Sequence, residues 1–245
     1  MVITTTAIAF LLSGLCLVFC GLWFFKAFRK IGGLKSNNQI GILLSGFFLG
    51  NSLQHIILAI GGFFFAKNSD ALQAILVIDN LILAIITALG VYLIFYILFP
   101  NVSPRLPTII TLIYGLFVVS MTIFSRPKPL LTSSLAIDWN MSPLTELSLY
   151  YLLLLNIGAP FLIFLKNLFN TTSRDVRLIS LIIVIATAAG LVNISIAFLD
   201  FLKSYEDLRV FIFDRVLGVI GILFVAGFLL MPLFWRLITK RFYGK

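Results

Sequence analysis

Seven long apolar runs divide the chain, and short segments that contain charged residues separate them. A run of about 18 or more residues with few charges is long enough to cross the roughly 30 Å hydrocarbon core of a bilayer. These runs are apolar all around a helix, as membrane spans are, rather than along one stripe. The pattern predicts transmembrane helices at approximately 4–25, 40–65, 73–99, 106–125, 147–166, 178–200 and 210–236.

These helices account for nearly the whole length. We therefore expect an all-α membrane protein in which residues 1–245 form one domain, a seven-transmembrane-helix bundle. The longest connection, residues 125–146, is too short for an independent domain. The opening MVITTTAIAF has no positive charge before its apolar stretch, whereas a cleaved signal peptide has one. Residues 1–25 are therefore expected to remain as the first helix.

Composition and charge agree with a membrane protein and add its orientation. Hydrophobic residues make up 61% of the chain, and the mean hydropathy is +1.13. Twelve of the 18 lysines and arginines fall in the segments that are inner if the N-terminus is outside. Because basic residues collect on the cytoplasmic side, we predict an outer N-terminus, a cytoplasmic C-terminus and a multi-pass position in the plasma membrane. The inner basic residues are Lys26, Arg29, Lys30, Lys35, Arg105, Lys166, Arg174, Arg177, Arg236, Lys240, Arg241 and Lys245.

The net charge of +9 is explained by this topology together with contact to anionic lipid headgroups. The bilayer is thus the expected partner, and nucleic acid is not. Cys16 and Cys20 lie four residues apart on one helix face, but two thiols without further ligands make a poor zinc site. We expect them to be small buried side chains, and we predict no metal and no cofactor.

Small and polar residues mark the faces that pack against other helices in a membrane. Helical spacing of 3.6 residues per turn aligns such residues on four of the predicted helices. The fifth helix instead has Asn156 followed one turn later by Pro160, which frees a backbone carbonyl. The aligned sets are Gly41, Ser45, Ser52, His55, Ala59 and Gly62; Asn80, Ala84 and Thr87; Ala186, Gly190, Asn193 and Ala197; and Asp214, Gly218 and Gly221.

From the predicted orientation and the position of each residue along its helix, we expect the ionisable and amide residues to lie in the outer half of the bundle. His55 lies about 10 Å below the outer surface at 1.5 Å per residue, and Asn193 reaches a similar level. The inner half has almost no polar residues. We predict an outer-half pocket lined by the candidate ligand-binding residues His55, Asp79, Asn80, Asn193, Asp214 and Arg215.

Several positions are open to Asp79. It points inward, where it binds a cation or protonated ligand from outside or forms a buried pair with Arg215, or it sits shallow at the headgroup level because residues 80–99 alone can span. The apolar residues 71–78 favour the inward position, since they would otherwise lie outside the core. His55, the only histidine, is expected to donate a hydrogen bond to a neighbouring helix, and a pH response is the alternative.

Several kinds of chemistry are not indicated. The run at 216–235 has no lysine for a retinal Schiff base, and phosphate loops and metalloprotease signatures are absent from the sequence. A serine, His55 and Asp79 do not amount to a catalytic triad, because any chain with this many serines offers such a set. We therefore do not expect an enzyme.

The second half resembles the seven-helix N-terminal sensor module of bacterial membrane histidine kinases. The likeness rests on MSPLTELSLYYLLLLNIG (141–158), the basic turn SRDVR (173–177), a sixth helix rich in small residues, and LFWRLITKRF (233–242). In that family, cytoplasmic kinase or other output domains follow the seven helices. The chain stops at Lys245, so the resemblance implies either a separate signalling partner or a longer parent protein.

The leading hypothesis is a receptor-like, sensory membrane protein that signals through a separate cytoplasmic partner at the basic inner loops. One alternative is a small-solute or ion transporter or channel, which needs polar groups continuing into the inner half or matched broken helices. Another is a structural or accessory subunit of a membrane complex. The GFFLG motif adds a homodimer through Gly46 and Gly50 as a further hypothesis, because GxxxG allows two helices to approach closely.

Overall fold

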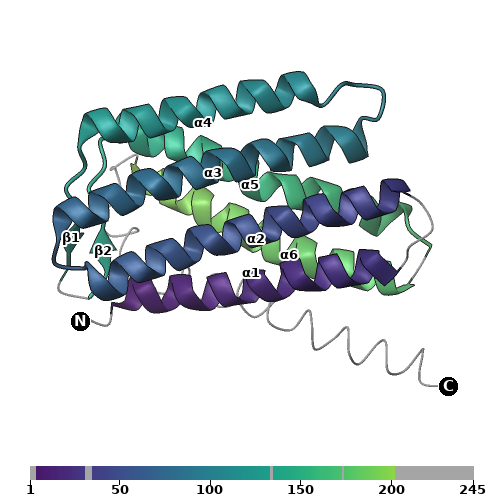
Figure 1. Ribbon diagram of the computed structural model, residues 1–245, viewed down its shortest axis with the longest axis horizontal. Helices are drawn as coiled ribbons and strands as arrows, with labels where there is room; N and C mark the ends of the chain where they lie inside the picture. Colours follow the sequence, from purple (N-terminus) through teal and green to yellow (C-terminus); the bar gives the residue numbers. More distant parts are fainter. Residues whose placement is uncertain (1–3, 31–34, 133–134, 173, 202–245) are drawn as a thin grey trace.

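The computed structural model describes residues 4–30, 35–132, 135–172 and 174–201, and some side chains within helices at these boundaries are not described. Six helices and one short antiparallel strand pair make up this part of the chain (Figure 1). The predicted seventh helix at 210–236 lies outside the described residues. The helices are α1 (Thr5–Lys30), α2 (Lys35–Phe64), α3 (Ser69–Leu98), α4 (Arg105–Ser125), α5 (Pro143–Asn170) and α6 (Arg174–Phe201).

Five of these helices, α1 to α5, are long and apolar enough to cross a membrane, and α6 contains a shorter apolar stretch at Val176–Val192. The structure thereby confirms an all-helical, multi-pass membrane architecture. The count of seven helices and the orientation remain predictions. Both α2 and α3 have 30 residues, about 45 Å at 1.5 Å per residue. They are therefore longer than the hydrocarbon core, and their ends extend beyond it.

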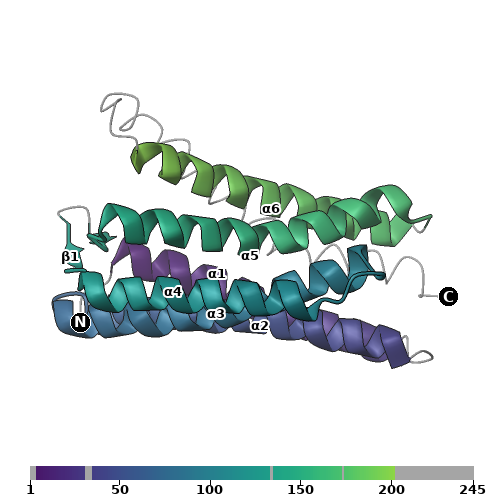
Figure 2. The same ribbon diagram turned by 90° about the horizontal axis from the view of Figure 1, so that it is seen from above.

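Four helices lie side by side in the order α4, α3, α2, α1, and α5 and α6 cover one side of this layer (Figures 1 and 2). Helix α3 packs against α2, α4 and α5, so it occupies the centre of the described bundle. We call the end with the α2–α3 and α4–α5 connections the outer end and the opposite end the inner end. These names follow the predicted topology.

Small residues join α1 to α2 closely. The hydroxyl of Ser45 donates to the Gly21 carbonyl, and that of Ser52 donates to the Gly14 carbonyl, each at 2.8 Å. A Cβ added at Gly14 would lie 3.0 Å from Ile56 Cγ1 and 3.3 Å from the Ser52 carbonyl oxygen, so glycine lets the two helices approach closely here. The small-residue face predicted for the second helix therefore packs against the first.

The GFFLG motif faces α3 of the same chain at one of its two glycines. A Cβ on Gly50 would come within 2.8 Å of Ile86, whereas Gly46 is exposed, with Leu89 3.8 Å from its added Cβ. Close packing at Gly50 thus occurs within one chain. The homodimer through this motif remains a prediction.

Two apolar clusters fill the interior. The larger one, toward the inner end, joins α1, α2, α3, α5 and α6 and includes both cysteines. In it, Phe24 stacks on Phe48 with ring centroids 5.1 Å apart and touches Phe164 at 5.8 Å. Cys16 and Cys20 are buried and free, as the sequence predicted. The smaller cluster joins Leu83, Val118, Leu149 and Leu152 of α3, α4 and α5.

The outer α4–α5 connection folds back over the start of α1. Its strands β1 (Leu130–Leu131) and β2 (Ile137–Asp138) pair antiparallel. The Leu135 carbonyl, held by a left-handed backbone with φ of 58°, accepts the Thr5 N–H at 3.0 Å. The Ile137 N–H donates to the Thr6 hydroxyl at 3.0 Å. The first bond satisfies one of the free N–H groups at the N-terminus of α1, and the second ties β2 to the same helix end.

Candidate functional site

A band of buried and half-buried polar side chains crosses the bundle between α2, α3, α4 and α5. Helix α3 supplies its two central members. The Asn68 side chain caps α3 by accepting the Ala71 N–H, and ten residues after Ser69 the helix reaches Asp79, about 15 Å along its axis. We call this band the polar layer; its members are Asn51, Gln54, Asp79, Asn80, Thr122 and Asn156.

Asp79 is held by α2. Its side chain is only 4% exposed, and its Oδ2 accepts a hydrogen bond from Gln54 Nε2 at 3.3 Å. The other oxygen, Oδ1, is buried and has no hydrogen-bond partner among the described residues. Protein surrounds this carboxyl group, so the expectation of a solvated Asp79 is wrong, while its depth in the membrane stays a prediction.

Asn80 turns to the opposite neighbour. Its Nδ2 donates to the hydroxyl of Thr122 on α4 at 2.9 Å, and that hydroxyl donates to the Val118 carbonyl. Successive residues on a helix point about 100° apart, so Asp79 and Asn80 join α3 to two different helices. The amide oxygen of Asn80 is also buried without a partner in the described part of the chain.

A third bond ties α5 to α2 near the middle of both helices. Asn156 Nδ2 donates to Asn51 Oδ1 at 3.1 Å, and Asn51 Nδ2 donates to the Phe47 carbonyl. Pro160 lies four residues after Asn156 inside α5, and its missing N–H removes the helical donor for the Asn156 carbonyl. A weakened turn of α5 therefore coincides with its polar contact to α2.

His55 does not join the carboxyl group. Its Nδ1 lies 2.8 Å from the Asn51 carbonyl of its own helix, and a carbonyl only accepts, so Nδ1 carries the hydrogen. The ring meets Phe10 of α1 edge-on, with centroids 5.6 Å apart. Among the described residues, His55 makes its hydrogen bond within α2 and not to the neighbouring helix that we expected.

Of the six candidate residues, the structure places His55, Asp79 and Asn80 and directs each to a different neighbour. Asp214 and Arg215 lie outside the described residues, and so does the side chain of Asn193. The pairing of Asp79 with Arg215 thus stays a prediction.

Gln54, Thr122 and Asn51 were missed as candidates. The sequence carried one signal for them, because Asn51, Ser52, Gln54 and His55 form a polar group within two turns of an apolar helix. Such a group offers polar side chains to more than one side of the helix.

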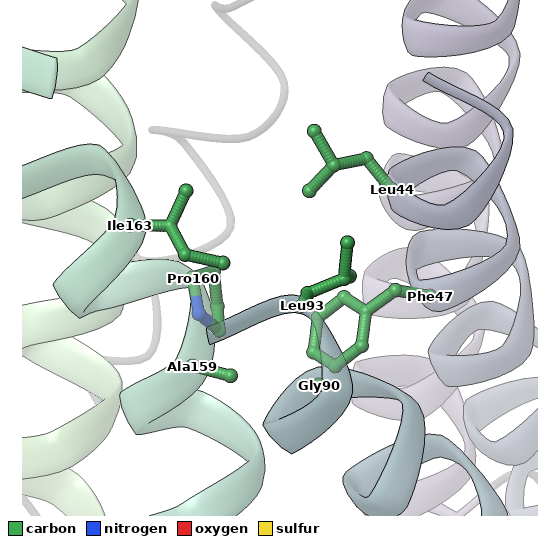
Figure 3. A pocket seen from close by; sticks show the side chains of 7 residues that line it. All are labelled: Leu44, Phe47, Gly90, Leu93, Ala159, Pro160 and Ile163. Carbon is green, nitrogen blue, oxygen red and sulfur yellow. The ribbon is translucent and has the colours of Figure 1, made fainter. Parts of the chain in front are cut away.

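Toward the inner end from the polar layer, the interface between α2, α3 and α5 is apolar. Figure 3 shows the recess at this place, between Gly90 of α3 and Pro160 of α5. The recess has no polar surface and no room for a water molecule. Its lining residues are Leu44, Phe47, Gly90, Leu93, Ala159, Pro160 and Ile163.

Two atoms of the polar layer, Asp79 Oδ1 and Asn80 Oδ1, are buried without a hydrogen-bond partner among the described residues, and both are acceptors. A buried group left unpaired costs about 1–3 kcal/mol. No cluster of three or more His, Cys, Asp or Glu side chains occurs within the described ranges. The unpaired acceptors leave room for the layer to exchange hydrogen-bond partners. Its one ionisable group is the Asp79 carboxyl group.

Comparisons with protein-family models, with curated proteins and with solved structures find no match to this chain.

Proposed function

We propose that this chain is a sensory membrane protein in which the polar layer switches between two hydrogen-bond arrangements. The observation that carries the proposal is the environment of Asp79, a buried carboxyl group that, among the described residues, has one hydrogen bond, from Gln54, and a second oxygen without a partner. Ionisable residues inside membrane segments are costly and mark function more often than packing.

The energetics of the layer suit a switch. Hydrogen bonds between membrane helices are worth about 0.6 kcal/mol on average, so exchanging one partner for another changes the free energy by little. Two arrangements separated by a few kcal/mol are both populated, and a stimulus that favours one of them shifts the balance. Asp79, Asn80 and Asn51 reach three different helices, which lets a change at one residue alter how several helices pack.

The inner half supports sensing over transport. Toward the inner end from the layer, the described interior holds the aromatic cluster of Phe24, Phe48 and Phe164 and the apolar recess beside Pro160. A solute path would need a continuous set of polar groups there, whereas the buried polar side chains of this part, such as Ser45, Thr87 and Ser180, are single hydroxyl groups. A rearrangement of the layer can instead be passed on by rigid helices to their inner ends, where basic residues such as Arg105, Arg174 and Arg177 are exposed and available to a cytoplasmic partner.

The test measures helix positions at the inner end of the full chain in lipid nanodiscs. Spin labels on Asn101→Cys and Phe169→Cys, in a Cys16→Ala, Cys20→Ala background, report the distance between the α3–α4 connection and α5. Both labelled positions are exposed. We expect two distance populations, with Asp79→Asn shifting the protein toward one of them.

Asp70→Asn is the matched control, because this carboxylate is exposed in the first turn of the same helix. It should leave both populations unchanged. A single distance that Asp79→Asn does not alter would refute the switch. Solute flux in proteoliposomes that is lost in Asp79→Asn would assign the layer to transport instead.

A further inference from the structure

We infer that Asp79 is a reversible proton-binding site and that the proton is the ligand to which the polar layer responds. The inference rests on the proposed function, since it names the stimulus of that switch.

The surroundings of Asp79 fit a neutral carboxyl group. An ionised carboxylate is a pure acceptor with about four lone-pair positions to satisfy. Here it receives one bond, from the neutral Gln54 amide, and Oδ1 receives none from the described residues. Proteins that keep a buried carboxylate charged supply a cation or several N–H donors. A proton removes the charge and turns one oxygen into a donor.

The charged side chains on the helices around Asp79 lie near helix ends. Helix α3 has Asp70, which is exposed at its start, α4 has Arg105 at its first residue, and α2 has Lys35 at its first residue. Helix α5 has Glu146 at its outer end and Lys166 near its inner end, where Lys166 donates to the Ile97 carbonyl.

The other titratable groups on these helices also have separate contacts. His55 bonds to the Asn51 carbonyl and faces Phe10, Tyr114 donates to the Ser148 carbonyl, and Tyr150 donates to Glu146. Tyr92 and Tyr96 stack on each other at least three turns farther along α3. Tyr151 of α5 is exposed. Within the described ranges, therefore, Asp79 has no cationic partner, and an unpaired buried charge is strongly unfavourable.

A proton fits this place better than a metal ion does. Metal cations such as Ca²⁺ and Mg²⁺ require about six or more oxygen ligands in a defined shell, and in the described part of the chain Asp79 belongs to no group of three or more His, Cys, Asp or Glu side chains. Gln54 also presents its N–H group, the positive end of its amide, to the carboxyl group. That orientation repels a metal cation, whereas a protonated carboxyl group still accepts the bond on Oδ2.

The two forms of Asp79 demand different neighbours. The neutral form keeps the Gln54 bond and has an O–H to donate, which suits a layer with acceptors left unpaired among the described residues. The ionised form needs donors or water that the described packing does not provide. Loss of the proton therefore favours a second arrangement in which the helices separate or exchange partners, and proton concentration sets the balance.

The test is infrared difference spectroscopy of the full chain in nanodiscs during a pH titration. We expect a carbonyl stretching band of a protonated carboxylic acid that disappears as the pH rises. The band should be missing in Asp79→Asn, retained in Asp70→Asn, and shifted in frequency in Gln54→Leu, where the hydrogen bond to Oδ2 is lost. Far-ultraviolet circular dichroism at each pH confirms that the helices remain folded.

Two results would overturn the inference. One is a spectrum in which Asp79→Asn removes no carboxylic acid band at any pH at which the protein is folded. The other is loss of the band on adding sodium, potassium or calcium chloride at constant pH, which would make Asp79 a metal-cation site. The spin-label distances test the proposed function separately. A titrating carboxylic acid band without a distance change would leave Asp79 as a proton-binding site but refute the switch and its response to the proton. A distance change without the band would keep the switch and refute the proton as its stimulus.

Discussion

Gln54 of α2 donates a hydrogen bond to the carboxyl group of Asp79 on α3, with 3.3 Å between Nε2 and Oδ2 and both side chains buried. This bond joins two helices that follow each other in the chain. The next residue, His55, turns to α1 instead. Gln54, which bonds to the carboxyl group, and His55, the only histidine of the sequence, are thus adjacent residues of α2 that face different helices.

Removing the side-chain amide of Gln54 should destabilise the protein, because the Asp79 carboxyl group stays buried without this donor. We expect Gln54→Leu to lower the free energy of unfolding by about 1–3 kcal/mol, because a buried acceptor loses its only donor in the described structure. Reversible unfolding in mixed detergent micelles measures the change. In the double variant Gln54→Leu, Asp79→Leu, two apolar side chains meet, and most of the loss should be recovered. Equal losses in the single and double variants would contradict this pairing.

The bond between α3 and α4 should be weaker but measurable. Asn80→Leu and Thr122→Val each remove the Asn80–Thr122 hydrogen bond, and a double-mutant cycle should give a coupling of about 0.6 kcal/mol, with an upper range near 1.7. Ser120→Ala is the control, since the Ser120 hydroxyl is exposed and bonds only to Leu116 of its own helix. Additive effects of Asn80→Leu and Thr122→Val would show that the contact does not form.

The α3–α4 interface should not tolerate a methyl group at Gly115. A Cβ there would overlap the Cβ of Ala84, so Gly115→Ala must push the two helices apart at a cost of about 1–3 kcal/mol. Thermal unfolding in detergent reports this change. Gly158→Ala adds the same methyl group where nothing lies within 4 Å, and it should be neutral or slightly stabilising. Similar melting temperatures for both variants would argue against this helix contact.

Both cysteines should be unreactive in the folded protein. Cys16 and Cys20 are 2% and 1% exposed in the inner apolar cluster, so a maleimide should modify neither in nanodiscs and both after denaturation in SDS. Mass spectrometry counts the added groups. Rapid labelling of either thiol in the folded state would show that the face of α1 with Cys16 and Cys20 does not pack in the inner apolar cluster.

The predicted orientation can be tested with single introduced cysteines in a background without Cys16 and Cys20. Lys67 lies in the α2–α3 connection and Asn101 in the α3–α4 connection, and both are exposed. In intact cells, a membrane-impermeant maleimide should label Lys67→Cys and leave Asn101→Cys unlabelled until the membrane is opened. The reverse labelling pattern would show that the N-terminus lies inside, which is the opposite of the orientation predicted by the positive-inside rule.

The membrane helices could be predicted closely from the sequence because what makes a segment helical in a bilayer lies within that segment. Every backbone N–H and C=O in a bilayer must be bonded within the segment, so a long apolar run forms a helix wherever it stands in the chain. The five long helices α1 to α5 follow such runs. The small-residue face with Ser45 and Ser52 was also predictable, since only small side chains allow helices to approach closely. What that face packs against, namely α1, was not.

The partners of the polar residues could not be read from the sequence, because they depend on how each helix is rotated and which helices lie beside it. A step of about 100° sends Asp79 to α2 and Asn80 to α4, and a similar step sends Gln54 to α3 and His55 to its own helix and α1. Sequence spacing identifies residues that share a face. It does not reveal which face of which helix contacts Asp79. The packing of α3 between its neighbours determines that contact.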